Sequence, residues 1–401
     1  MRLRAVGTSF FLLILLVLAS LILAPFVFAQ TVDDEVEFRY HFYEDNRGLT
    51  VKTPYLILRK QVTEQTAVSL RYTYETFEID AKEAAASVGT GGDAGGGEHD
   101  HEKSSRQKIL MAVDGISGAS AVAQSAAGLA KEIRQEVVAS VSHQWGQAVV
   151  GGTYAFSDED DYRSQAFGLS FSRDFLLRNT NLTAQYVHAM DDVNNLDRQP
   201  GETDWPRDKK THGGTLVLTQ ILSPKSFVRL GYGITDVEGY QASPYRKVVI
   251  NATRFDEIHP ENRLRQTFFA WINRYFETRT SAHLNGTYYR DDWGVRAHSV
   301  EIKVYQYLSD PFVLRFRYRY YDQSKADFFN PDRTLPEAIM SADPKLRDFD
   351  ANLYGIKFIY RFGKLPFRFL ERIDIEAGFN RLAEPGGFHA NISQAALRMV
   401  F

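Results

Sequence analysis

The chain has 401 residues, of which 44% are hydrophobic, 24% charged and 13% aromatic, and it contains no cysteine. These fractions are those of a folded protein and exclude a disordered chain. With 47 Lys+Arg against 50 Asp+Glu, the formal net charge of -3 offers no basic field for nucleic acid. The absence of cysteine excludes disulfides, thiolate metal sites, covalently attached haem and a lipid-modified N-terminal cysteine.

The N-terminus has the pattern of a secretory signal. Arg2 and Arg4 precede an apolar run over residues 10–28, which ends in small side chains at the usual cleavage spacing. The pattern predicts a signal peptide at 1–29 and a single mature domain at 30–401; the alternative is an uncleaved membrane anchor. No later stretch approaches the roughly eighteen apolar residues that a spanning helix needs. Any further membrane insertion must therefore be as a β-barrel.

From about Glu35 onward, apolar and polar residues alternate in segments of roughly ten residues, which is the pattern of strands with two different faces. Between Phe312 and Tyr321, large apolar or aromatic side chains alternate with a set that holds three arginines. A soluble β-sandwich explains any one such segment. Because the segments recur along the chain and their connections are alternately short and long, we predict an all-β fold, a transmembrane antiparallel β-barrel.

Loop parity makes the strand count testable, because both ends of a bacterial single-chain barrel normally face the periplasm. The short turns fall on the periplasmic side if there are sixteen strands; they lie at 63–65, 145–146, 176–179, 223–225, 277–279, 309–311 and 363–371. Every long connection, the longest being 81–130, is then extracellular. Two strand-like stretches, Ile109–Val113 and Val248–Ala252, must lie in loops; as wall strands they would make eighteen. We predict about sixteen strands, within fourteen to eighteen.

The last segment ends on Phe401, with Ala395, Leu397 and Met399 on the same face. A terminal Phe on such a strand resembles the signal read by the outer-membrane barrel assembly machinery. The expected location is therefore the outer membrane of a Gram-negative bacterium. The expected partners are the lipid bilayer, lipopolysaccharide and that machinery, together with a second copy of the chain or a partner protein, and no nucleic acid.

Charged residues on the polar face of each strand must point into the lumen, because Arg or Lys at the lipid midplane costs about 2–4 kcal/mol. The candidate solute-contacting residues are Arg71, Arg229, Arg315, Arg317, Arg319 and Arg361; Lys357, Glu75, Glu301, Asp374 and Glu376 are placed with them. One interpretation is that the row Arg315, Arg317 and Arg319 lowers the barrier for anionic solutes. The other is a wall of charge pairs that only satisfies itself.

The predicted loop 81–130 has two parts. A Gly-rich stretch leads to His99 and His101, which alternate with acidic residues and are candidate ligands for zinc or copper; a solvated, weakly selective tract is the alternative. Residues 109–130 are apolar and rich in small side chains, which is unusual for a surface loop. We hypothesise that this part forms a constriction or plug, with Asp114 and Ser117 in it; an extra hairpin is the alternative.

Catalytic patterns are poor. Ser142 and His143 are adjacent in a strand and point to opposite faces, and no spacing of Ser, His and Asp singles out a triad. We therefore expect no enzyme and no cofactor. A His within hydrogen-bonding reach of a Ser or Asp at the extracellular edge would instead indicate a rim hydrolase.

Several motifs in the same order resemble a family of bacterial proteins known only as a domain of unknown function and usually taken to be an outer-membrane barrel. They are Asp114–Ser120, Arg178–Thr180, Ser243–Arg246, Asp291–Gly294 and Arg317–Ser324. The resemblance spans most of the mature chain. It implies the location and the fold class, and it brings no activity and no catalytic residues.

Two of these motifs have a physical interpretation. Asp291–Gly294 has the composition of a tight hairpin turn, with Gly294 free to take a positive φ and Trp293 expected at the lipid interface. Ser243–Arg246 lies in a long outer loop, where Pro244 fixes the backbone and Arg246 can anchor to a neighbouring loop or the lumen wall.

Three functions of a barrel remain open from the sequence, and a soluble periplasmic β-protein, which would show no heat-modifiable migration, is a fourth alternative. The first is a porin-like channel for small solutes, which requires an open lumen. The second is a scaffold barrel filled by its own loop or by a partner, such as a secreted or redox protein, and used for export, extracellular redox chemistry or assembly. The third is an outer-membrane rim hydrolase.

Overall fold

A computed structural model describes residues 34–79, 132–196, 198, 201–363 and 369–401. Every regular element in these ranges is a β-strand, and none of them contains a helix long and apolar enough to cross a membrane. The predicted signal peptide, residues 1–29, lies outside the described residues.

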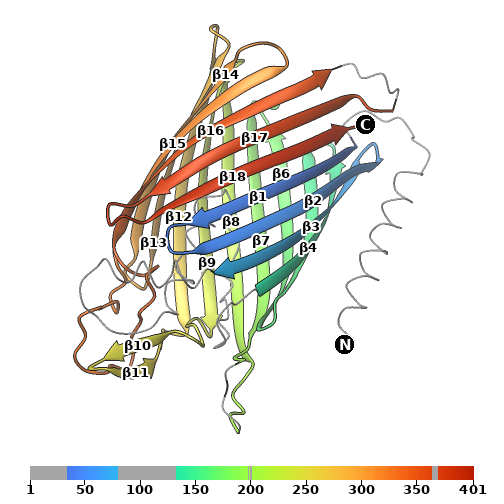
Figure 1. The fold of residues 1–401 in the computed structure, drawn as a ribbon. Helices are drawn as coiled ribbons and strands as arrows, with labels where there is room; N and C mark the ends of the chain where they lie inside the picture. Colours follow the sequence, from blue (N-terminus) through green and yellow to red (C-terminus); the bar gives the residue numbers. More distant parts are fainter. Residues whose placement is uncertain (1–33, 80–131, 197, 199–200, 364–368) are drawn as a thin grey trace, which may run out of the picture.

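Sixteen strands close into one barrel (Figure 1). They are β1 (Glu35–Asp45), β2 (Leu49–Thr63), β3 (Thr66–Ile79), β4 (Glu132–Trp145), β5 (Ala148–Asp158), β6 (Tyr162–Phe175), β7 (Thr180–Val193), β8 (Arg207–Ser223), β9 (Ser226–Gly239), β12 (Asn262–Phe276), β13 (Thr280–Asp291), β14 (Arg296–Tyr307), β15 (Phe312–Gln323), β16 (Phe349–Gly363), β17 (Arg372–Ala383) and β18 (His389–Val400). The predicted count of sixteen is confirmed.

All wall strands pair antiparallel with their neighbours, and β1 pairs with β18 to close the ring. The one departure from sequence order is that β9 pairs with β12. The strands between them, β10 (Lys247–Ile250) and β11 (Thr253–Asp256), form a separate hairpin. The prediction that Val248–Ala252 lies in a loop is therefore confirmed, whereas Ile109–Val113 lies outside the described residues.

Every connection longer than eight residues lies at one end of the barrel, here called the loop end, and all connections at the other end, here called the turn end, have eight residues or fewer. At the turn end, β6 and β7 are joined by residues 176–179, and the φ angles of Leu176, Leu177 and Arg178 are 49°, 57° and 67°. Three successive non-glycine residues in the left-handed region are uncommon. They reverse the chain within a few residues and so hold β6 and β7 side by side.

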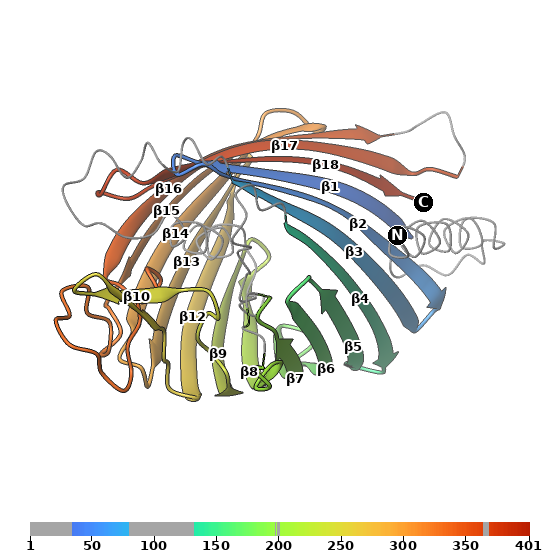
Figure 2. The same cartoon turned by 60° about the horizontal axis from the view of Figure 1, so that its bottom comes forward.

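The two faces of the wall differ in chemistry, as alternation requires. On β15, Phe316 and Tyr318 are 50% and 39% exposed on the outer face, while Arg315 and Arg317 on the inner face are 6% and 5% exposed. Figure 2 shows how the wall curves, with β15 to β18 and β1 to β3 arching opposite β5 to β9 and β12. An apolar, aromatic exterior around a polar interior is the surface that a lipid-embedded barrel presents.

Trp293 corrects one expectation. Its predicted place at the lipid interface is wrong: the ring is 4% exposed and packs with Val295, Ala326 and Leu346. The loop between β15 and β16 covers the turn, so the indole gains a dry site and donates a hydrogen bond from Nε1 to the Asn262 carbonyl at 2.9 Å. The tight turn is as expected, with Gly294 at φ 86°.

Candidate functional site

The inner wall is divided into a neutral half and a charged half. Across β5 to β9, one row of paired inward-facing residues consists of Gly151, Ser170, Gln185, Thr215 and Gly233. The residues of this row are uncharged and mostly small. The row is therefore suited to line a solute path without attracting ions of either sign, although Arg229 on β9 lies elsewhere on the same half.

The charged half runs from β13 through β18 and on to β1–β4, and it contains all the predicted lumen residues except Arg229, which lies on β9. Much of its charge is paired on the wall itself. Arg71 Nη2 lies 2.7 Å from Glu136 Oε1, and Lys357 Nζ lies 2.8 Å from Glu376 Oε2. Cross-strand pairs of this kind hold long side chains against the wall, so the net field in the lumen is much weaker than the number of arginines suggests.

The three arginines of the row on β15 differ in the side chains that they contact. Arg317 donates from Nε to Glu301 Oε2 at 2.6 Å, and Glu301 also binds Lys303 Nζ at 2.8 Å. Arg319 faces Glu301 across the ladder. Arg315 has no carboxylate oxygen within ion-pairing distance among the described residues.

An aromatic pair on β12 was not predicted as part of the lumen. The Phe269 ring lies against Gly231 on β9, and its centroid is 5.4 Å from that of Trp271. Arg229 stacks over Trp271 at 5.2 Å and donates from Nε to Thr219 at 3.1 Å. Gly231 is the feature of the sequence that could have predicted this aromatic pair, because an inward-facing glycine leaves room for a ring on the neighbouring strand.

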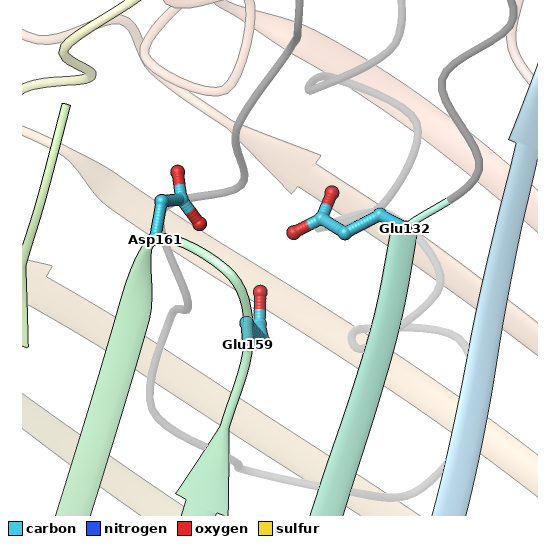
Figure 3. A group of neighbouring side chains, drawn as sticks. All are labelled: Glu132, Glu159 and Asp161. Carbon is cyan, nitrogen blue, oxygen red and sulfur yellow. The ribbon is translucent and has the colours of Figure 1, made fainter. Parts of the chain in front are cut away.

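At the loop end, three carboxylates converge from β4 and from the connection between β5 and β6 (Figure 3). Glu132, Glu159 and Asp161 are buried, and one oxygen of each lies within 4.8 Å of the others. Arg134 Nε lies 3.6 Å from Glu159 Oε1 and supplies compensating charge. None of the three acids is without a partner, so the cluster is not a set of free ligands.

The two predicted metal ligands, His99 and His101, lie outside the described residues. The two constriction candidates, Asp114 and Ser117, also lie outside them. Both expectations therefore remain predictions.

Two loops form a folded unit at the loop end, here called the loop cap: residues 240–261, which include β10 and β11, and residues 324–348. Arg246 joins them, because its Nη1 lies 3.0 Å from Glu257 Oε2 and 3.0 Å from Asp343 Oδ2. A backbone bridge between Ile258 and Met340 adds a second link. Arg246 therefore anchors to a neighbouring loop, one of its two expected positions.

The Glu257 carboxylate is the centre of the loop cap. Burial raises its pKa, but the Arg246 guanidinium and the His259 and Ser341 side chains outweigh that effect and hold the pKa well below its ordinary value. The carboxylate also accepts from the Ala342 backbone N–H at 3.0 Å. Glu257 is therefore ionised and fixed, which stabilises the contact between the two loops.

The loop cap contains a Ser–His pair, the feature expected of a rim hydrolase. His259 Nε2 lies 2.9 Å from Ser341 Oγ, and its Nδ1 lies 3.1 Å from the Gln241 carbonyl oxygen. However, Ser341 is 2% exposed, and Glu257 bonds to the serine and the Nε2 side of the ring instead of to Nδ1. A nucleophile needs access to substrate, so this arrangement supports the cap and does not by itself indicate catalysis.

The chain matches, over residues 13–371, a family model described as a protein of unknown function, DUF3570. The chain belongs to this DUF3570 family. No curated protein sequence matches it.

Solved structures with a similar fold are outer-membrane barrels. A bacterial polysaccharide outer membrane secretin is 7% identical, with a TM-score of 0.49, over 92% of this chain and 100% of that one. CdiB from Acinetobacter baumannii is 8% identical, with a TM-score of 0.49, over 92% of this chain and 60% of that one. A BenF-like porin from Pseudomonas fluorescens Pf-5 is 7% identical, with a TM-score of 0.45, over 94% of this chain and 100% of that one.

In this DUF3570 protein, three of the motifs meet at one corner of the loop end. Arg246 lies in the loop cap, Trp293 packs beneath it, and Ser324 follows β15 into the cap. The Ser324 hydroxyl donates to the Gly294 carbonyl at 3.2 Å and accepts from the Arg296 backbone N–H at 2.9 Å. These motifs therefore build one structural corner, which explains their chemistry without a catalytic role.

Proposed function

We propose that this protein is a porin-like channel of the outer membrane that passes small solutes. The observation that carries the proposal is a closed barrel of sixteen antiparallel strands with an apolar outer face and a polar inner face. A barrel of this size leaves an aqueous interior unless something fills it. The loop end then faces the outside of the cell and the turn end faces the periplasm.

Arginines on the inner wall support a preference for anions. Among the described residues, Arg229, Arg315 and Arg361 have no ion pair, whereas Arg71 and Arg317 are neutralised by acids on neighbouring strands. The unpaired cations give the lumen a modest positive field. We therefore expect weak anion selectivity, which lower salt strengthens.

A second candidate is a barrel whose lumen is occupied, and one observation favours it. Inward-facing apolar side chains gather at the loop end, where they are at most 8% exposed; on the strands they are Tyr43, Leu49, Val51, Phe77, Ala351, Leu353, Leu382, Ala390 and Ile392. An apolar patch on the inside of an aqueous pore is costly when wet. This barrel would serve as a scaffold for a partner or would be closed by its own chain.

Single-channel conductance of the refolded mature protein in a planar bilayer separates these functions, alongside a variant that lacks residues 109–130. Steady open-channel current with anion preference supports the channel. Current only after the deletion supports an occupied barrel closed by its own chain. Absence of current from both proteins, with heat-modifiable migration intact, contradicts the channel and favours the scaffold or a rim enzyme.

A further inference from the structure

We propose that Arg315 and Lys357 form an oxyanion-binding subsite on the inner wall, which takes the carboxylate or phosphate group of a small anionic solute. The proposal rests on the proposed channel function for its class of solute. The subsite is a defined place on β15 and β16, in contrast to a diffuse positive field in the lumen.

The first argument is the hydrogen-bonding edge of Arg315. Its Nε and Nη2 are buried and have no hydrogen-bond partner among the described residues, and the residue is 6% exposed. These two nitrogens lie on one edge of the planar guanidinium, and their parallel N–H groups match the two oxygens of a carboxylate or phosphate. Within the described ranges, no other arginine has both nitrogens of this edge buried without a partner.

The neighbouring Arg317 shows that a carboxylate fits this edge of a guanidinium. Arg317 is two residues further along the same face, and its Nε and Nη2 lie 2.6 Å and 2.5 Å from Glu301 Oε2. The wall thus supplies a carboxylate to Arg317 and none to Arg315. Because buried donors without an acceptor are unfavourable, an oxyanion from solution that reaches Arg315 is bound.

The second argument is the row in which Arg315 lies. Strand register places six inward-facing residues on one row across six strands: Tyr305, Arg315, Lys357, Gly378, Gln394 and His41. Arg315 and Lys357 are direct cross-strand partners, and Glu376 pairs with Lys357 at 2.8 Å, so the unpartnered donors of this pair are those of Arg315. An oxyanion on the Arg315 edge also lies beside Lys357, which lowers the repulsion between the two like charges.

The positions of Gly378 and Glu376 define the subsite further. A Cβ at Gly378 would lie 3.5 Å from Lys357 Cβ and 3.6 Å from its Cε, so the glycine lets the lysine lie along the wall. Lys357, His41 and Gln394 border a small recess on the same wall, together with Arg39 and Glu376. Since Lys357 stands between Arg315 and Glu376 in strand order, it screens the bound oxyanion from that carboxylate.

Isothermal titration of the full mature protein in detergent tests the subsite, with inorganic phosphate and succinate as separate probes. We expect Arg315→Gln to weaken binding by about tenfold and Arg315→Lys, which keeps the charge but loses the planar edge, by a smaller factor. Arg372→Gln is the matched control, because it removes an inner-wall arginine that is paired with Asp374 at 3.1 Å. The affinity of the Arg372→Gln variant for each probe should equal that of the wild type. Heat-modifiable migration confirms that each variant is folded.

Loss of affinity in Arg315→Gln alone supports the subsite, and the probe that binds identifies phosphate or carboxylate as its ligand. Equal weakening in Arg372→Gln, or no binding of either probe to the wild type, overturns it. Binding does not depend on current, so the channel and the subsite can fail separately. A conducting protein with no Arg315-dependent binding contradicts only the subsite, whereas a silent protein that binds contradicts only the channel.

Discussion

Single residues contribute more to the stability of the loop end than to that of the wall. In the wall, each side chain has many equivalent neighbours along the ladder. In the loop cap, by contrast, Arg246 is the link between Glu257 and Asp343, two acids that are far apart in sequence. Buried charges of this kind are stable only as a complete set, so the loss of one member leaves the others uncompensated.

We predict that Glu257→Gln opens the loop cap while the barrel stays folded. The change leaves Arg246 buried with half of its compensating charge, and breaking a buried pair costs about 3–5 kcal/mol. Limited proteolysis of outer membranes should show faster cleavage within residues 240–261, with unchanged heat-modifiable migration. Asp256→Asn is the control, because this acid is exposed and its ion pair in the described part of the chain is with Lys247. Equal resistance of the two variants to proteolysis would contradict the role given to Glu257.

The loop cap should also loosen in acid. Because the pKa of Glu257 lies below its ordinary value in the folded cap, ionisation stabilises the cap fully above the unfolded pKa of about 4.3, and this stability is lost as pH falls further. Pepsin cleavage of the cap should therefore accelerate between about pH 4 and pH 2. In Glu257→Gln the cleavage rate should depend much less on pH. An identical pH profile in both proteins would show that another group controls the opening.

A glycine on the inner wall provides a test of packing in the lumen. A Cβ at Gly231 would collide with the Phe269 ring, whereas a Cβ at Gly213 would meet Thr235 Oγ1 at 3.7 Å, an ordinary contact. Gly231→Ala should therefore destabilise the barrel by about 1–3 kcal/mol, and Gly213→Ala should not. The temperature at which heat-modifiable migration is lost reports the difference. Restoration of that temperature in Gly231→Ala/Phe269→Ala would assign the effect to the ring.

At the scale of elements, the wall could be predicted from the sequence and the loop cap could not. The wall follows from two local signals, alternation and connection length, which both recur along the chain. The positions of Trp293 and Arg246 depend instead on the connection between β15 and β16, which folds over the turn after β13. No periodic pattern reports a contact between two irregular loops, so the sequence favoured the lipid interface for the tryptophan.

The same limit applies to the candidate lumen residues. Their face could be predicted, because the penalty for charge in lipid fixes it. Their partners could not, because partnership depends on register: Arg317 reaches Glu301, and Arg315 reaches no carboxylate of the ranges that the structure describes, although both arginines belong to one alternating run. A shift of register by one residue would exchange the two faces, and a shift by two would exchange their partners.

Removal of the β10 and β11 hairpin should leave the barrel intact. The hairpin forms its own two-stranded sheet, and its contacts run through Val248 and Ile250 to Met340 in the other cap loop. We expect a variant with residues 247–256 replaced by a short Gly-Ser linker to keep heat-modifiable migration, although the cap becomes sensitive to protease. Failure of this variant to fold would show that the hairpin contributes to closure of the wall.

At the scale of the whole molecule, the number of strands determines which connections lie at the same end of the barrel as the two chain ends. An even number of antiparallel strands puts both ends of the wall on one side, and β1 pairs with β18 from Glu35↔Val400 to Asp45↔Ala390. All connections longer than eight residues lie on the side opposite the two chain ends, and four short connections lie there as well. Orientation in the membrane then decides which side of the cell the cap and the apolar inner patch face.

Because the chain has no cysteine, single substitutions can report that orientation directly. Asp332 is exposed in the loop cap, and Glu277 is exposed in the turn between β12 and β13. We predict that Asp332→Cys reacts with a membrane-impermeant maleimide on intact cells, whereas Glu277→Cys reacts only after the outer membrane is permeabilised. The reverse pattern would invert the barrel. Labelling of both on intact cells would mean that the wall does not separate two compartments, which is incompatible with a channel.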